Sequence, residues 1–317
     1  MATTQNGVYA AAHFALELDN KKDVGLFRSI EGGGVRADVM TYQYNANNPV
    51  GYERWKILGK PKFEDIKLQV GMGMSQPFYE WLKDFFAGNA SRKNGAIIAA
   101  DFYYKERARR TFTEALIKEL TFPKLDASDK NAAYMNVTLA VEDITFEKGN
   151  GNVVDVPKGW TAQKLWTACN FRFSLEGLGD ACNRVTKIDS FTIKQNIIEH
   201  HVGGRKAPIK TPSPIEYPNI TFYLPEADVQ PFVDKMATRI GFGGKGNGTV
   251  RDPHAIHGQI DTYDNEFSSI FRLDFWGADI LSITPDRSEA SSEEVKMCKI
   301  EMHTEKMEFW YPRLEVV

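Results

Sequence analysis

The sequence predicts a mainly β protein made of two tandem β-barrel or β-sandwich domains, each with one packed α-helix. Three observations support this fold class. Short stretches alternate between apolar and polar residues, a helix-start phrase appears twice, and these features recur in the same order in both halves of the 317 residues. Such ordered repetition indicates that one domain was duplicated.

The first predicted strands alternate in the same way in both halves. Residues 13–19, HFALELD, correspond to residues 170–176, NFRFSLE, and both place an apolar side chain at every second position. Residues 30–39, IEGGGVRADV, likewise correspond to residues 188–197, IDSFTIKQNI. A period of two is typical of a strand with one buried face, so we predict two such strands at the start of each half.

A strand followed by a helix comes next in each half. The phrase QPF occurs at residues 76–78 and again at residues 230–232, each time after an alternating strand. Helix signals surround the first copy, with Ser75 as a favoured N-cap, Pro77 in the first turn and Gly88 after the end. We interpret the apolar faces of both helices as core packing. Their residues are Phe78, Trp81, Leu82, Phe85 and Phe86 in the first, and Phe232, Met236 and Ile240, before Gly241, in the second.

The last part of each half is a turn rich in Pro, Ser and Asp followed by an alternating strand. Val137, Leu139 and Val141 correspond to Ile300, Met302 and Thr304. The offset between the halves changes along the chain, from about 157 to 154 to 163 residues, as short loop insertions would produce. We place the first domain at residues 1–149, a linker rich in Gly, Asn and Lys at 150–169, and a second, diverged domain at 170–317.

Composition excludes several classes of protein. The chain is 42% hydrophobic and 26% charged, with a formal net charge of -3, so it resembles neither a disordered chain nor a strongly basic nucleic-acid binder. No stretch approaches the about 20 apolar residues that span a bilayer. The three cysteines show no metal-type spacing and the N-terminus shows no secretory pattern, so we expect a reduced, cytoplasmic protein.

No catalytic or metal-binding motif is present. Residues 240–250, IGFGGKGNGTV, lack the spacing of a phosphate-binding loop and follow a helix, so we predict a surface loop. His254 and His257 are expected in a loop without a third metal ligand. Several carboxylates are interpreted as solvated, namely Glu142, Asp143, Glu293 and Glu294. We therefore expect no catalytic residues, no metal and no cofactor.

Several ordered blocks in residues 25–148 resemble one protein family. They include GKPKFEDIKL from Gly59, a helix with FYEWL from Phe78, RKNG from Arg92 and PKLDAS from Pro123. In this order they resemble the tail-tube protein family of contractile phages and related injection systems. The resemblance covers the first half best, because the second half lacks a GKPK block and has Lys235 in place of Trp81.

The resemblance implies a structural function. Proteins of this family are similar in being β-barrels with one helix that form six-fold rings, which stack into a hollow tube inside a contractile sheath. For this chain it implies a tail-tube protein without enzymatic activity, in a virion tail or injection-system particle assembled in the bacterial cytoplasm. Its partners would be itself, the sheath protein, and baseplate and tail-terminator proteins, while DNA or an effector would pass through the lumen without specific binding.

Two alternatives remain open at this stage. Two-barrel relatives also serve as baseplate hub or tube-initiator adaptor proteins, in which three chains imitate a six-fold ring. A protein of another class, a cytoplasmic enzyme on tandem β domains, would have its site in the loop from Gly241 to Gly258. The sequence does not choose between three and six chains per ring.

Assembly contacts are predicted in three segments. Residues 41–62 have the length of a protruding β-hairpin or loop with a composition suited to a protein interface. The expected contact residues are Tyr42, Tyr44, Tyr52, Arg54, Trp55, Lys56 and Lys60, together with Arg205 and Lys206 in the corresponding basic segment of the second half. In the strand from Ile66, the polar residues Asp65, Lys67 and Gln69 lie opposite the apolar ones and are candidates to face a lumen.

Overall fold

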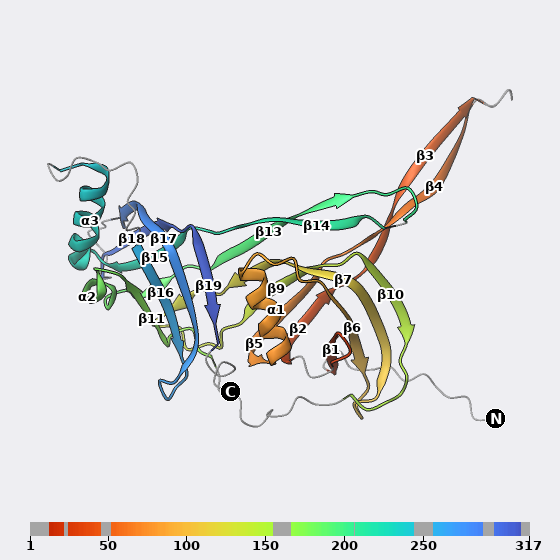
Figure 1. Ribbon diagram of the computed structural model, residues 1–317, viewed down its shortest axis with the longest axis horizontal. Helices are drawn as coiled ribbons and strands as arrows, with labels where there is room; N and C mark the ends of the chain where they lie inside the picture. The colour runs from red at the N-terminus through yellow and green to blue at the C-terminus, as the bar shows by residue number, and fades with distance from the viewer. Residues whose placement is uncertain are drawn as a thin grey trace.

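A computed structural model of the protein describes residues 13–21, 25–45, 52–154, 166–205, 207–243, 256–287 and 295–311. Two β-sheet units lie next to each other along the long axis of the molecule, and a two-stranded arm projects from the first (Figure 1). Among the described residues, no helix is both long and apolar enough to cross a membrane.

The first unit is a twisted sheet packed on one helix. Its path of paired strands is β1 (Phe14–Leu18), β6 (Lys93–Ala100), β7 (Glu106–Phe122), β9 (Met135–Ala140), β5 (Ile66–Met74) and β2 (Gly25–Gly32), and β10 (Asp143–Lys148) also pairs with β7. Helix α1 (Gln76–Phe86) lies between this unit and the second one (Figure 1).

The second unit repeats this order strand by strand. Its path is β11 (Phe171–Leu175), β16 (Ile256–Tyr263), β17 (Ser269–Pro285), β18 (Met297–His303), β15 (Ile220–Pro225) and β12 (Lys187–Ile188), with β19 (Lys306–Trp310) paired to β17. Three helical segments accompany it, namely α2 (Gly179–Cys182), the 3-10 turn η2 (Glu226–Asp228) and α3 (Gln230–Ile240). The predicted fold class, two β units with one packed helix each, is confirmed.

Each unit also carries a long hairpin with the same register. In the arm, β3 (Val35–Asn45) pairs with β4 (Tyr52–Phe63), and Arg36 lies opposite Lys62. In the second unit, β13 (Phe191–His200) pairs with β14 (Ile209–Glu216), and Lys194 lies opposite Glu216. Both hairpins have a register shift at the same place, just after the residue that follows Arg36 or Lys194. The predicted protruding segment is therefore a β-hairpin, and it is longer than residues 41–62.

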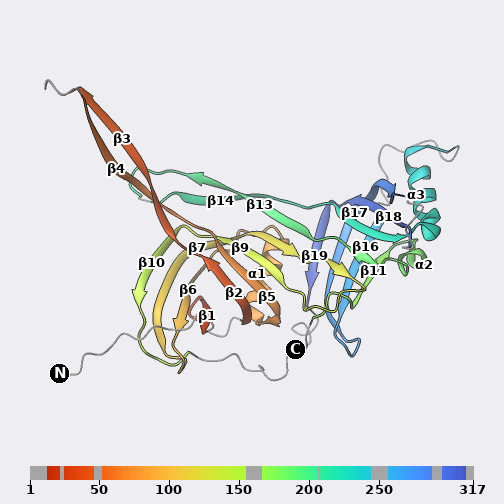
Figure 2. The same cartoon turned by 180° about the vertical axis from the view of Figure 1, so that it is seen from behind.

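The two units exchange strands. β13 of the second half pairs with β7, and the two-residue strand β8 (Leu125–Asp126) of the first half pairs with β12. The β13–β14 hairpin consequently lies over the first unit in both views (Figure 1, Figure 2). The division at residues 1–149, 150–169 and 170–317 stays a proposal about the duplicated units. Within the proposed linker, Trp166 is buried in the core.

The core contains the predicted apolar face of α1. Phe78, Trp81, Leu82, Phe85 and Phe86 are all buried there, and α1 ends as expected before Gly88. Helix α3 buries Phe232 and ends at Gly241, which has a positive φ.

One part of the α3 prediction is wrong. Ile240 lies at the end of the helix and is 57% exposed. Its counterpart at the end of α1, Phe86, stacks on Phe309 of β19, whereas β17 meets the last turn of α3 at Arg239 and leaves the Ile240 side chain exposed.

Candidate assembly surface

The two units are joined by a continuous antiparallel sheet. The end of β7 pairs with the start of β13, so that Leu120 lies opposite Ile193 and Thr121 opposite Thr192. The hydroxyl oxygens of the two threonines are 2.8 Å apart. The opposite edge of the same part of β7 is taken by β9. Because both edges are paired, the backbone hydrogen-bonding groups at this junction are satisfied.

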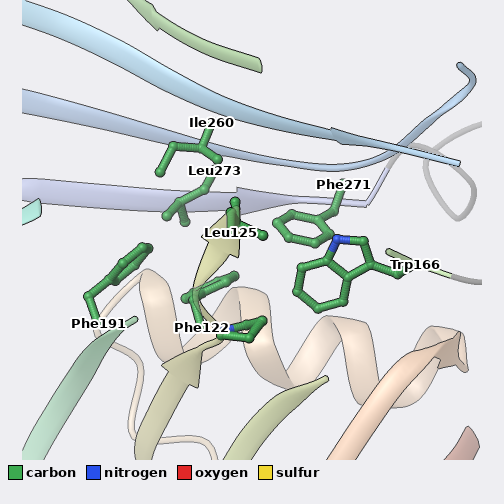
Figure 3. Close-up of a pocket in the computed structure, with 8 residues that line it drawn as sticks. Phe122, Leu125, Trp166, Phe191, Ile260, Phe271 and Leu273 are labelled. Atoms are coloured by element: carbon green, nitrogen blue, oxygen red, sulfur yellow. The ribbon is translucent and has the colours of Figure 1, made fainter. Parts of the chain in front are cut away.

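An aromatic cluster fills the space under this junction. Phe122 stacks on Phe191 with 5.1 Å between ring centroids and lies 5.8 Å from Phe271 of the second unit. Trp166 packs edge-on against Phe271 at 4.9 Å. Figure 3 shows these side chains and Leu273 converging from both units on one small apolar pocket. The joint therefore has the character of a domain core.

Helix α1 forms a second contact between the units. The ring of Phe86 stacks on Phe309 of β19 with centroids 6.1 Å apart. The Tyr79 hydroxyl accepts a hydrogen bond from the backbone N–H of Tyr311 at 3.0 Å. Phe86 is 4% exposed and Phe309 is 3% exposed, so this contact is dry.

A buried carboxylate forms a third contact. Glu142 accepts hydrogen bonds from Arg92 at 2.7 Å and from the backbone N–H of Lys210 at 2.8 Å, and Arg205 lies 3.5 Å from its other oxygen. The interpretation of Glu142 as a solvated residue is therefore wrong. The sequence does not show that the β13–β14 hairpin folds back and brings Lys210 and Arg205 to this carboxylate.

A polar face runs across the joined sheet. The register aligns one row of side chains on β2, β5, β9, β7, β13 and β14, and these are Glu31, Lys67, Thr138, Glu119, Lys194 and Glu216. Lys67 is exposed in this row, while Ile66, Leu68 and Val70 are buried beneath it. The Asp65 carboxylate accepts a hydrogen bond from Lys118 at 2.7 Å, which raises the pKa of Lys118. The row mixes both signs of charge and is not strongly basic.

The predicted contact residues lie mainly on the arm. Tyr42 and Trp55 are cross-strand partners and both are exposed, as are Arg54 and Lys56. Lys60 lies near the base of the arm and donates a hydrogen bond to the Arg205 carbonyl at 3.4 Å. Tyr44 and Tyr52 lie in the paired strands, whereas residues 46–51 and Lys206 lie outside the described part of the chain. Their role in contacts stays a prediction.

The arm also exposes apolar side chains that the sequence analysis did not select. These are Val35, Val39, Met40, Ile57 and Leu58. Exposed apolar residues on one projecting hairpin are typical of a protein interaction surface. The alternation of this segment was visible in the sequence, but a solvent-exposed hairpin and a half-buried one have the same period.

Those of the residues weighed for chemistry that the structure describes are not brought together into one cluster. His257 lies in β16 and not in the expected loop; its ring stacks on Trp276 and its Nε2 is 3.7 Å from Asp274. His254 lies outside the described residues. Burial raises the pKa of the Cys182 thiol to about 11. Within the described ranges, no group of three or more His, Cys, Asp or Glu side chains is placed to hold a metal ion.

Comparison with known proteins decides the family of the first unit. The family model described as T4-like virus tail tube protein gp19 matches residues 10–145. The first unit of this chain is a tail tube domain of that family. The matched range contains β1 to β9, α1 and the arm, and it ends within β10. The chain therefore carries a structural tail tube domain joined to a second unit of the same strand order.

Several solved structures also align with part of this chain. A chain of the sheath–tube complex of the PVC extracellular contractile injection system, in the extended state, has 19% identity and a TM-score of 0.39, covering 47% of this chain and 99% of that one. A chain of the anti-feeding prophage cap has 20% identity and a TM-score of 0.39, covering 47% and 100%. An Hcp1 protein from E. coli, carrying two substitutions, has 11% identity and a TM-score of 0.26, covering 45% and 91%. A search of curated proteins finds no match.

Proposed function

We propose that this protein is a ring-forming structural component of the tube of a contractile phage tail or injection system, without catalytic activity. One observation carries the proposal. A tail tube domain is joined, through a continuous β-sheet, to a second unit with the same strand order. A protein that already joins two such units edge to edge within one chain has the type of contact that a ring requires.

The duplication supports a ring of three chains. The resemblance to the family implies rings of six one-barrel subunits, and each chain here supplies two units. Three copies therefore make one ring of six units. The two units of a chain contact each other side by side, through β7, α1 and Glu142. These contacts support neighbouring positions of the two units in one ring and not positions in two stacked rings.

The polar face is the proposed wall of the channel. Its charged residues alternate in sign along the row from Glu31 to Glu216. A strongly basic wall would bind the phosphates of passing DNA, whereas a wall of mixed sign would let a polyanion or a protein effector pass. Lys67 and Gln69 on β5, with Asp65 just before it, belong to this wall in the proposal. Sheath, baseplate and terminator proteins are the proposed partners, in a particle assembled in the bacterial cytoplasm.

A second position in the same machine is favoured by the duplication itself. A hub or tube-initiator adaptor with two barrels per chain forms a ring of three chains that matches a six-fold ring above it. The two candidates differ in stacking, because a tube protein forms long rods by itself whereas an adaptor stops after one ring.

Electron microscopy with mass photometry tests the proposal. Purified protein is imaged by negative stain, and the mass of the particles is measured in the same sample. We expect hollow rings with three times the chain mass of 35.8 kDa. Stacked rods identify a tube protein, and single rings identify an adaptor. Six chains per ring would contradict the stoichiometry, and chains that remain monomeric at every concentration would contradict the proposed function.

A further inference from the structure

We infer that the junction inside each chain is repeated between chains, with β3 of one copy adding to the edge of β17 in the next copy. The inference rests on the proposed ring function and specifies which strands, side chains and register join the copies. It comes from comparing each residue at the internal junction with its counterpart on the outer ends of the molecule. The counterparts Val35, Phe146, Ile240 and Glu305 are exposed, whereas the equivalent residues of the internal junction are buried.

The strand edges are the first counterparts. In the internal junction, residues 119–122 of β7 lie between β9 and β13. The equivalent residues of β17, 282–285, pair with β18 on one edge, and no described strand pairs with the other edge. β3 is the counterpart of β13 and pairs only with β4 among the described strands. The chain thus has one strand to donate and one edge to accept it.

The register of the internal junction predicts the register between copies. Ile193 of β13 lies opposite Leu120 of β7, and both side chains are fully buried. Their counterparts are Val35 of β3, which is 51% exposed, and Ile283 of β17, which is partly buried. In the predicted pairing, Val35 lies opposite Ile283 and Arg36 opposite Ser282 of the next copy. Val35 would then be covered as Ile193 is.

An exposed aromatic residue is the second counterpart. Phe146 of β10 corresponds to Phe309 of β19, and Ile240 of α3 corresponds to Phe86 of α1. Inside the chain Phe86 and Phe309 stack and are buried, whereas Phe146 is 58% exposed and Ile240 is 57% exposed. The inferred contact places Phe146 of one copy on Ile240 of the next. It explains why α3 keeps an apolar residue at a position open to solvent.

A carboxylate is the third counterpart. Glu142 of the first unit accepts the backbone N–H of Lys210, and its equivalent in the second unit is Glu305. Glu305 is exposed, and no ion pair to its carboxylate is found in the described part of the structure. Lys56 on the arm is the register equivalent of Lys210. The inferred junction brings Lys56 to Glu305, so an accepting carboxylate meets a basic strand at both junctions.

All the donor groups lie at one end of the molecule and all the acceptor groups at the other. Figure 1 shows β3, β4 and β10 at one end of the long axis and α3, β17 and β18 at the opposite end. A chain cannot make these contacts with itself, and a head-to-tail contact of this type closes into a ring when the rotation between copies allows it. The stacked pair Phe122 and Phe191 has Pro285 and Gly33 as counterparts, so we expect the contact between copies to be weaker than the internal one.

Cysteine cross-linking tests the register. Two full-length variants are made in a Cys169→Ser background, one carrying Arg36→Cys and the other Ser282→Cys, and they are mixed and oxidised. Each variant carries a single new cysteine on a surface strand, so a mixed disulfide forms only between copies. We expect a band of twice the chain mass in the mixture and none in either variant alone. Lys62→Cys is the matched control, because it lies in the same row but one strand further from the partner edge.

A charged substitution tests the apolar contact. Phe146→Asp should raise the concentration required for ring formation about tenfold or more while leaving the circular dichroism of the monomer unchanged. Phe146→Leu should assemble normally. Phe102→Asp, at an even more exposed aromatic residue outside the inferred contact, should have no effect on ring formation.

The outcomes separate the inference from the proposed function. The expected cross-link together with impaired assembly of Phe146→Asp supports both. Rings that form without the Arg36–Ser282 cross-link, or that form normally with Phe146→Asp, overturn the inference and leave the ring function in place. Protein that never assembles overturns both.

Discussion

In each unit, one strand position requires glycine because an aromatic ring packs against the backbone there. Gly95 of β6 lies beneath the ring of Phe112, and Gly258 of β16 lies beneath the ring of Phe275. A Cβ atom at Gly258 would be 2.3 Å from the Phe275 ring, and one at Gly95 would be 2.6 Å from the Phe112 ring and 2.1 Å from the Glu17 carbonyl oxygen. Glycine inside a strand is normally unfavourable, so these positions are occupied by glycine because an aromatic ring covers the backbone there.

Substitution of Gly258 should therefore destabilise the fold. We expect Gly258→Ala to lower the free energy of unfolding by about 1–3 kcal/mol, because the added methyl group forces the buried Phe275 ring to move. Urea denaturation measures this change. Gly204→Ala is the control, since a Cβ atom there meets no atom within 4 Å, and it should stay within about 0.5 kcal/mol of the parent. Equal stability of the two variants would contradict the packing argument.

Two errors of sequence interpretation at the residue scale have the same cause. Ile240 and Glu142 were assigned from local pattern, Ile240 to the core and Glu142 to solvent, and both assignments are wrong. Periodicity predicts which face of an element is apolar, but it does not predict which other segment covers that face. Among the described residues the Ile240 side chain stays largely exposed, whereas Glu142 is buried by a hairpin far along the sequence.

At the scale of elements, the repeated helices and strands were predictable because their signals are local. The strand, helix start and helix end recur at both α1 and α3, and the structure confirms all of them. The two 17-residue strands β7 and β17 were less predictable, because each of them belongs to two parts of a sheet. Each bends at a residue of positive φ, Glu114 in β7 and its equivalent Gly277 in β17. Only the second is a glycine, so sequence alone marks one bend and conceals the other.

The arm permits a prediction about stacking. The arm projects beyond both sheets (Figure 1), and apolar side chains are exposed on both of its strands, so we expect its tip to contact an adjacent ring. Deletion of residues 45–52 should leave folded chains that form rings and no longer stack, because the inferred contacts within a ring use arm residues outside the deleted segment. Electron microscopy counts rods against single rings. Replacement of residues 46–51 by glycine and serine keeps the length of the arm, so it tests the side chains of the tip separately from the length of the arm. Unchanged stacking in the deletion variant would show that the tip does not contact the adjacent ring.

At the scale of the whole molecule, the duplication was visible in the sequence but the exchange of strands was not. The order of elements predicted two similar β units with one helix each, and the paired strands confirm that order. The pairing of β13 with β7 and of β8 with β12 joins residues far apart in the sequence, such as Thr121 and Thr192 or Leu125 and Ile188. Such pairings leave no periodic signal. The sequence therefore indicated the arm as a proposed assembly surface, but it did not indicate the junction between the two units.

Strand exchange should make the two units unfold together. Buried residues of both halves belong to one continuous hydrophobic cluster, and the aromatic joint around Phe122 connects them. Tandem domains usually unfold separately, but here neither unit can open without breaking the sheet and core of the other. We expect a single calorimetric transition, below the concentration of assembly, with equal calorimetric and van't Hoff enthalpies. Two transitions in the parent protein would show that the units are independent.

The aromatic joint is the place to break this coupling. Phe122→Ala should remove about 3–5 kcal/mol of stability, because the side chain is buried against Phe191 and Phe271. We expect the single transition to split or broaden in this variant, whereas Phe102→Ala, at an exposed turn, should leave it unchanged. The loss of one joint residue would then affect the ring as well as the monomer, because β13 and the outer edge of the second unit are positioned through the same joint.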